Sequence, residues 1–182
     1  PGGHADILSE LLLAQEMGLT DQELYDQLVT LCFAGFETTA STLSWAFALL
    51  AEHPTEEALV CAEAQQVGVS RPGQASATRA VHDETLRLYP PAHTLGRKAL
   101  RDVQVGPWLF RKGALVIISP WLMHRRPQLF ANPERVEPAR WRRDREVALP
   151  KCAYLPFGAG PRACLGGHFA TMQMQIVLKT FL

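Results

Sequence analysis

One helical pattern of unusual length limits the folds that this sequence can adopt. The residues Thr20 to Glu23 have the form of a capping box, in which a threonine and a glutamate bond each other's backbone N–H groups. From there the helical pattern runs unbroken to Glu52. The pair His53-Pro54 ends it, because the residue before a proline avoids helical backbone angles. About 32 residues at 1.5 Å each give a helix on the order of 48 Å long, which crosses a whole domain.

The remaining segments predict a mainly α fold with a small antiparallel β-sheet. Helical patterns cover residues 5–17, 56–66, 78–88 and 167–182, whereas short apolar runs between turns predict strands at 103–105, 108–110 and 114–119. Residues 68–77 are a loop by composition, and residues 125–156, rich in Pro and Arg, are expected to be irregular. The last pattern stops at Leu182 without a capping residue, so we expect residues 1–182 to be a single partial domain of a longer protein.

The composition argues against several classes of function. The 18 Lys and Arg residues balance the 18 Asp and Glu residues, so no bulk charge draws the chain to nucleic acid. No apolar run in the sequence approaches the ~20 residues that span a bilayer. The four cysteines have no Cys-x-x-Cys spacing, which argues against a zinc ribbon or a disulfide scaffold and fits reduced thiols.

The turn from Phe157 to Gly166 is the strongest candidate for a functional site. Its glycines at 158 and 160 permit backbone angles that other residues resist, and they let a flat ligand approach the main chain. The helix predicted to follow points its positive dipole end at Cys164, which favours the ionised sulfur. Such a thiolate is either a nucleophile or a metal ligand. A nucleophile would need a base, for which His168 is the local candidate; a Cys164–His168 zinc site has no second ligand pair at a suitable spacing.

The middle of the long helix contains residues that weaken helices. Gly35 costs about 1 kcal/mol relative to alanine. Three threonines and a serine follow it closely, and their hydroxyls compete for backbone hydrogen bonds. One interpretation is a ligand groove beside Gly35, with Thr38 and Glu37 next to it as a proton relay. The alternative is a helix crossing packed through small residues, with Glu37 simply solvated.

Two opposite charges share a face of the helix predicted for residues 78–88. Glu84 and Arg87 are three residues apart. A surface pair of this kind contributes under about 1 kcal/mol. The apolar neighbours indicate instead that the pair is buried, and a buried pair needs a further partner. Arg140, in the irregular segment, is the candidate.

His124 lies at the corner where the predicted strands meet the irregular segment. One interpretation is an axial metal ligand. The other, which the sequence favours, is a buried histidine that packs and forms hydrogen bonds.

These motifs resemble those of the cytochrome P450 family of haem-thiolate monooxygenases. Residues 34–39 look like that family's oxygen-activation motif, Glu84 to Arg87 like its Glu-x-x-Arg motif, and residues 136–141 like the segment that supplies the third charge. The four motifs, the last of which is the cysteine turn, occur in the family's order, so the chain resembles the carboxyl-terminal half of such a protein. The cysteine turn has the defining positions of the family's haem-binding signature: Phe157, Gly158, Gly160, Arg162, Cys164 and Gly166.

The resemblance implies a role for each candidate residue. Cys164 would be the proximal ligand of the iron of haem b (iron protoporphyrin IX), where a thiolate favours O–O cleavage. Glu37 and Thr38 would deliver protons on the distal side. Phe157 would pack beside the thiolate, and Gly158 and Gly166 would be part of the haem-binding turn. Arg162 and Arg97 would contact the haem propionates. The structural triad would consist of Glu84, Arg87 and Arg140.

The implied reaction inserts one atom of dioxygen into an apolar small molecule, with electrons from a protein donor, either a ferredoxin or a flavin reductase. The Arg-rich run from Arg140 to Arg145 is either a docking site for an acidic donor or a solvated loop. Two alternatives remain for the chain as a whole: a truncated, haem-free fragment without activity of its own, and a peroxide-using haem-thiolate enzyme. A cytoplasmic location is expected if the protein is of a soluble bacterial type.

Overall fold

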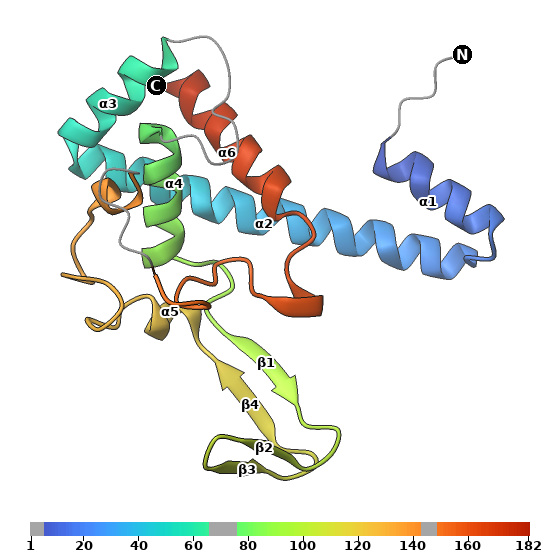
Figure 1. The fold of residues 1–182 in the computed structure, drawn as a ribbon. Helices are drawn as coiled ribbons and strands as arrows, with labels where there is room; N and C mark the ends of the chain where they lie inside the picture. Colours follow the sequence, from blue (N-terminus) through green and yellow to red (C-terminus); the bar gives the residue numbers. More distant parts are fainter. Residues whose placement is uncertain (1–5, 66–75, 143–148) are drawn as a thin grey trace. The chain divides into compact units, whose positions relative to one another are not determined.

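The computed structural model of the chain describes residues 6–65, 76–142 and 149–182 (Figure 1). It is mainly helical with two small antiparallel sheets, which confirms the predicted fold class. The chain forms two compact units, residues 1–40 (unit 1) and residues 41–182 (unit 2), and the long helix α2 (Asp21–Glu52) contributes to both.

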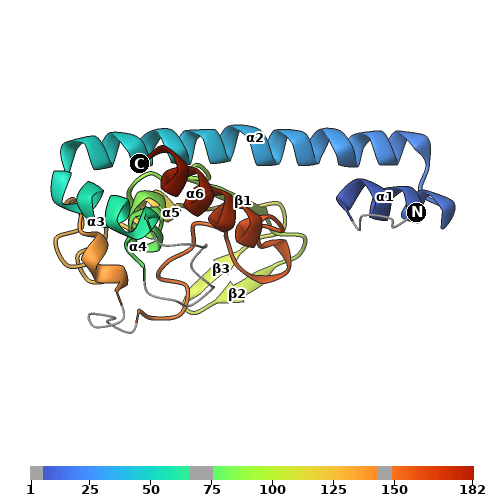
Figure 2. The ribbon, with the colours of Figure 1, turned by 90° about the horizontal axis from the view of Figure 1, so that it is seen from above.

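Unit 1 consists of α1 (Ile7–Glu16) and the first part of α2. The predicted capping box is formed: the N–H of Thr20 donates to Oε2 of Glu23 at 3.0 Å, and the N–H of Glu23 donates to Oγ1 of Thr20 at 3.3 Å. From this cap α2 continues as one unbroken helix of 32 residues, as the sequence predicted (Figure 2).

Unit 2 has its core where the end of α2 meets α3 (Pro54–Ala64), α4 (Ala77–Leu88) and α6 (Gly167–Phe181). Trp45 of α2 stacks on Tyr89 at the end of α4, with ring centroids 3.9 Å apart and planes 4° from parallel. Glu63 of α3 accepts a hydrogen bond from the N–H of Thr78 at 3.1 Å and pairs with Lys179 at 2.8 Å. Helix α4 is therefore held from several sides. The buried apolar cluster consists of Ala46, Leu50, Val60, Val81, Met174 and Leu178.

Two antiparallel strand pairs follow α4. Strands β2 (Val103–Val105) and β3 (Trp108–Phe110) pair with each other across Gly106, whose φ is +55°, and both were predicted. Strand β4 (Leu115–Ile118), also predicted, pairs with β1 (Leu95–Lys98), which was not. Because β1 contains a glycine and two cations, its sequence has little β preference, and its conformation follows from the pairing with β4.

The segment after β4 is largely irregular, as expected, apart from the short helix α5 (Pro120–Met123) and the 3-10 turn η1 (Pro138–Trp141). Arg142 pairs with Glu56 at 3.0 Å, whereas residues 143–145 of the Arg-rich run, and most of the loop predicted at 68–77, lie outside the described residues. No helix in the described ranges is both long enough and apolar enough to cross a membrane.

Candidate functional site

The turn from Phe157 to Gly166 presents Cys164 at the surface of unit 2. Gly158 and Gly160 have φ angles of +70° and +74°, where a side chain would strain the backbone. The N–H of Cys164 donates to the carbonyl of Phe157 at 2.8 Å and closes the turn, within which the 3-10 turn η3 (Gly160–Arg162) forms. Cys164 is an exposed free thiol, and α6 begins three residues after it. As predicted from the sequence, Cys164 lies at the end of a glycine-spaced turn just before a helix.

Phe157 is held between helices α4 and α6. A Cβ atom added to Gly167, the first residue of α6, would lie 3.3 Å from the Phe157 ring, so the glycine allows the ring to pack against the backbone. The ring also stacks with buried His82 of α4, with centroids 6.4 Å apart. Nδ1 of His82 bonds Oδ1 of Asp83 at 2.9 Å. His82 was not predicted from the sequence, where its place two residues before Glu84 on a helix with apolar neighbours was the available signal.

Strand β1 lies beside the same turn. A Cβ atom on Gly158 would be 3.9 Å from Cδ1 of Leu95. Since side chains alternate along a strand, Arg97 lies on the same face of β1 as Leu95. Arg97 is exposed, with Nη1 donating to the Gly96 carbonyl at 2.8 Å, and Arg162 of the turn is exposed as well.

These features fit a flat, anionic ligand whose metal binds sulfur. No described atom outside the neighbouring residues lies within 4 Å of a Cβ built on Gly160, so a planar group can approach the main chain there. The thiol supplies one soft ligand. Arg97 and Arg162 supply exposed guanidinium groups, which recognise carboxylates through paired hydrogen bonds. These side chains and the open backbone fit a haem.

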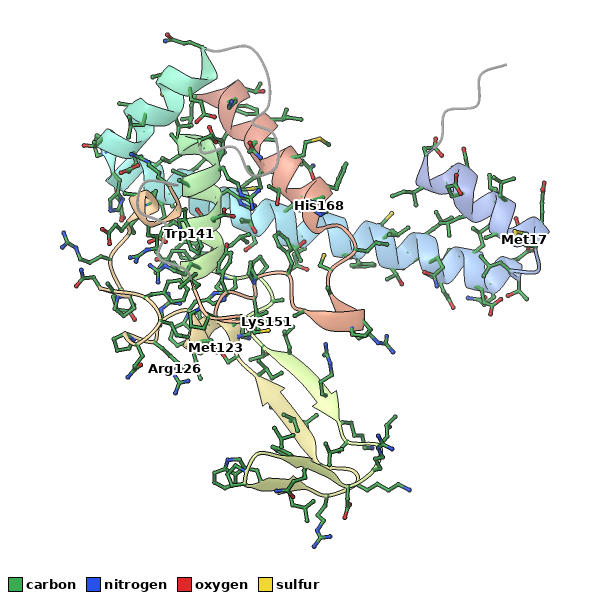
Figure 3. All side chains as sticks on the ribbon, viewed as in Figure 1. Met17, Met123, Arg126, Trp141, Lys151 and His168 are labelled. Atoms are coloured by element: carbon green, nitrogen blue, oxygen red, sulfur yellow. The ribbon has the colours of Figure 1, made fainter. Side chains whose placement is uncertain are left out.

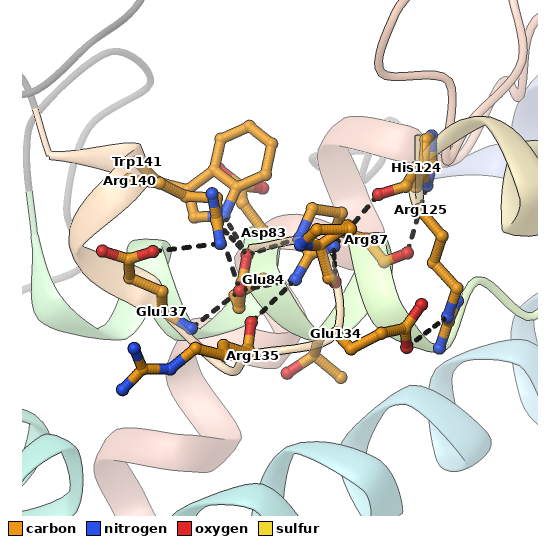
Figure 4. Close-up of polar contacts among 12 residues, drawn as sticks. Asp83, Glu84, Arg87, His124, Arg125, Glu134, Arg135, Glu137, Arg140 and Trp141 are labelled. Carbon is orange, nitrogen blue, oxygen red and sulfur yellow. Dashed lines mark hydrogen bonds and ion pairs between the residues drawn. The ribbon is translucent and has the colours of Figure 1, made fainter. Parts of the chain in front are cut away.

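Behind this surface, Glu84 and Arg87 form a fully buried ion pair (Figure 4). Nε and Nη2 of Arg87 each donate to a different oxygen of Glu84 at 2.9 Å. The remaining N–H groups of Arg87 donate to three backbone carbonyls, those of His124, Pro133 and Arg135, at 3.0, 2.6 and 3.0 Å. All five N–H groups of the guanidinium thus have partners.

Glu84 is satisfied from the irregular segment. It accepts from the N–H of Glu137 at 2.8 Å and from Nε of Arg140 at 3.3 Å. Trp141, labelled in Figure 3, donates from Nε1 to Glu84 at 2.8 Å. It is a fourth member of the cluster and was not predicted from the sequence. Burial raises the pKa of Glu84, but the hydrogen bond and charge of Arg87, with the charge of Arg140, outweigh it and leave the pKa below its ordinary value. The carboxylate is therefore ionised at neutral pH.

Both histidines considered as metal ligands have ordinary structural environments. His124 is buried, and both of its ring nitrogens lie within hydrogen-bonding distance of backbone groups, which favours the packed-histidine interpretation. His168 is exposed on α6 (Figure 3). In residues 6–65, 76–142 and 149–182, no three His, Cys, Asp or Glu side chains gather into a metal site.

The candidate proton relay belongs to unit 1, in the middle of α2. Thr38 and Glu37 are exposed, and Oγ1 of Thr38 donates to the carbonyl of Ala34 at 2.7 Å. No described side chain lies within 4 Å of a Cβ built on Gly35. Phe33 and Phe36 are 73% and 77% exposed. This part of α2 therefore presents open backbone, a hydroxyl, a carboxylate and aromatic surface.

Comparison with known proteins agrees with these features. A family model described as "Cytochrome P450" matches residues 2–182. Cyclooctatin synthase of Streptomyces melanosporofaciens is 39% identical over 187 residues, which cover 97% of this chain and 41% of that protein. Pentalenene oxygenase of Streptomyces avermitilis is 34% identical over 186 residues, and cytochrome P450 3A11 of Mus musculus is 36% identical over 170 residues.

Solved structures show the same similarity. The crystal structure of a cytochrome P450DA mutant haem domain superposes with a TM-score of 0.85 at 30% sequence identity, covering 98% of this chain and 42% of that one. A second crystal structure, of the cytochrome P450DA haem domain, gives a TM-score of 0.79 at 28% sequence identity. This chain therefore spans 41% of the length of the two Streptomyces relatives and 33% of the length of the mouse relative.

Proposed function

Because this chain belongs to the cytochrome P450 family, we propose that it is the haem-binding, carboxyl-terminal part of a monooxygenase. The single observation that carries the proposal is the exposed thiol of Cys164, held in a turn whose glycines leave space for a planar ligand. Both units, residues 1–40 and 41–182, would belong to one haem domain that the rest of the protein completes.

The proposed cofactor is haem b, which when bound supplies the iron that activates dioxygen. Cys164 would hold the iron through its sulfur, Phe157 would pack beside the sulfur, and Gly158 and Gly166 would keep the backbone of the turn open. Arg97 and Arg162 would pair with the propionates. The Glu84 cluster would act structurally, since its members are committed to one another and to backbone carbonyls.

The proposed substrate is an apolar small molecule, and the electrons would come from a ferredoxin or a flavin reductase. Two relatives are named for pentalenene and cyclooctat-9-en-7-ol, an alkene and an alkenol by their names. In this chain the exposed Phe33 and Phe36, on either side of Gly35, offer apolar surface for such a molecule. Animal and bacterial relatives have similar identity to this chain, so the sequence similarity alone favours no particular substrate.

Isotopically labelled dioxygen tests the reaction class. The haem-loaded protein, given a reductase system and a panel of alkenes and alkenols, should release a product that contains one labelled oxygen atom. Mass spectrometry measures the label. A product formed only with peroxide would favour the peroxide-using alternative, and failure to bind haem would favour the haem-free fragment.

Thr38→Ala should uncouple electron use from product formation. The hydroxyl of Thr38 and the carboxylate of Glu37 can hold and pass a proton, and positioned proton transfer contributes about 10²–10⁴-fold. We therefore expect product per electron pair to fall roughly tenfold or more, with reduced oxygen species released instead. Cofactor consumption, product and peroxide are measured together in one reaction.

Thr30→Ala is the matched control for Thr38→Ala. Thr30 lies on the same helix, is also exposed, and donates to the carbonyl four residues earlier, that of Asp26, at the same 2.7 Å. Its replacement should leave coupling unchanged. Equal coupling in the Thr38 variant and the wild type would show that Thr38 takes no part in proton delivery.

A further inference from the structure

The ring of His124 joins two segments that are far apart in the sequence. Its side chain is fully buried. Nδ1 lies 3.3 Å from the carbonyl oxygen of Arg87, near the end of α4, and Nε2 lies 2.9 Å from the backbone nitrogen of Leu155. We call these two hydrogen bonds the His124 bridge. The ring also packs against Phe130 and Tyr154, with centroids 6.1 and 5.1 Å away.

The bridge requires a neutral imidazole with its proton on Nδ1. The carbonyl of Arg87 can only accept, so Nδ1 must donate to it. The N–H of Leu155 can only donate, so Nε2 must be the unprotonated nitrogen. A second proton, on Nε2, would point at the N–H of Leu155 and replace an attraction by a repulsion between two donors.

Leu155 connects the bridge to the cysteine turn. Its N–H donates to His124, and its carbonyl accepts from the N–H of Gly158 at 3.1 Å. Two residues after Leu155, the carbonyl of Phe157 accepts from the N–H of Cys164 at 2.8 Å. A continuous path of backbone and hydrogen bonds thus runs from α4 through the imidazole to the residue that carries the thiol.

We propose that His124 is a positioning residue for the cysteine turn: its neutral ring ties the segment leading into the turn to α4, and protonation of the ring breaks the bridge and loosens the turn. The part of this inference that concerns the iron ligand rests on the proposed haem-thiolate function. The bridge itself depends only on contacts within unit 2.

The groups around the ring oppose a positive charge on it. Arg87, whose Nη1 donates to the carbonyl of His124 at 3.0 Å, and Arg125 are the charged groups that act on it. The pKa of His124 lies at about 4: burial lowers it most, the hydrogen bond to the Arg87 carbonyl raises it, and the charges of Arg87 and Arg125 lower it again. Burial raises the pKa of Tyr154 well above its ordinary value, so the phenol beside the ring stays neutral.

These values fix the direction of the pH dependence. If opening of the bridge also exposes the ring to water, the pKa of His124 returns to its ordinary value of 6.5, whereas in the buried bridge it is about 4. Between these two values only the open form takes up the proton, so each fall in pH favours opening. The pH-dependent part of the stability of the bridge is fully present above about pH 6.5 and is lost as the pH falls to about 4. The opening equilibrium should change on the order of 10²–10³-fold across this range.

Two substitutions of His124 distinguish the effect of the hydrogen bond to Leu155 from the effect of protonating the imidazole. In His124→Gln, the side-chain oxygen can take the place of Nε2 and accept from Leu155, but it does not titrate. In His124→Asn, the shorter amide can donate to the Arg87 carbonyl in place of Nδ1 but gives Leu155 no acceptor. His53→Gln is the control, because Nδ1 of His53 bonds the carbonyl of Leu49, which is only four residues earlier in the sequence, at 2.7 Å.

The experiment measures amide hydrogen exchange at Leu155 in the haem-loaded protein between pH 7 and pH 4, by fragmentation mass spectrometry. The red-shifted Soret band of the reduced, CO-treated protein is recorded in the same samples. In the wild type and in His53→Gln, protection of Leu155 should fall about 10²–10³-fold towards pH 4, with loss of the band. His124→Gln should keep both across the range, and His124→Asn should lack Leu155 protection even at pH 7.

Two results would overturn the proposal: an acid transition in His124→Gln that matches the wild type, or wild-type protection of Leu155 in His124→Asn. If His124→Asn does not fold, the glutamine variant alone decides. The two hypotheses can also fail separately. If the wild-type protein shows no thiolate band at pH 7 but its Leu155 exchange still depends on His124, the His124 bridge is supported and the haem-thiolate function is refuted.

Discussion

Replacing Arg87 by alanine should strongly destabilise the fold of unit 2. The substitution leaves the buried carboxylate of Glu84 without its bidentate partner and removes the donors of three backbone carbonyls. Removing one partner of a buried pair costs about 3–5 kcal/mol, and each unsatisfied buried acceptor adds to this. A typical domain is stable by only about 5–15 kcal/mol. The expected loss is thus a large part of the total stability.

Urea unfolding followed by circular dichroism measures this loss as a shift in the midpoint. Arg87→Lys should not restore stability, because an ammonium group has three donors at one point and cannot match the five N–H groups of the guanidinium. Arg111→Ala is the control. Arg111 pairs with Asp102 at a similar 2.8 Å, but its side chain is 75% exposed, so its loss should leave the midpoint nearly unchanged. Similar shifts for Arg87→Ala and Arg111→Ala would contradict the structural role of the buried pair.

Part of this cluster could be predicted from the sequence, and part could not. The spacing of Glu84 and Arg87 places them on one helical face whatever the rest of the fold does. Arg140 required the argument that a buried pair needs another partner. The bond from Trp141 and the carbonyls of Pro133 and Arg135 come from an irregular segment, whose path is set by tertiary contacts and has no periodic pattern.

The same distinction holds for the candidate site. The cysteine turn was predictable because glycines, a proline and a helix start act over a few residues. Strand β1, which places Leu95 next to the turn, was missed because only its partner β4 makes it a strand. His124 was correctly expected to be buried and hydrogen-bonded, but its partners, Arg87 and Leu155, are each more than 30 residues away along the chain. No local pattern could identify them.

Replacing Cys164 by alanine should abolish the thiolate signature while leaving the fold intact. The thiol is exposed and its backbone N–H, which closes the turn on Phe157, is kept in alanine, so little stability should be lost. The sulfur is the soft ligand that the iron would bind, and a methyl group cannot replace it. The reduced, CO-treated protein should therefore lose its red-shifted Soret band completely, with an unchanged circular dichroism spectrum.

Cys152→Ala is the matched control, because Cys152 is also an exposed free cysteine in a turn before α6. Its φ angle is +67°, and cysteine and alanine both carry a Cβ atom, so the substitution adds no backbone strain. This variant should keep the band at full intensity. A band that survives in Cys164→Ala would show that Cys164 is not the iron ligand. A band that disappears in Cys152→Ala with the fold intact would show that the loss is not specific to Cys164. If the wild-type protein binds haem but shows no such band, the thiol does not reach the iron, and the glycine-lined turn would then have to be assigned to another planar ligand.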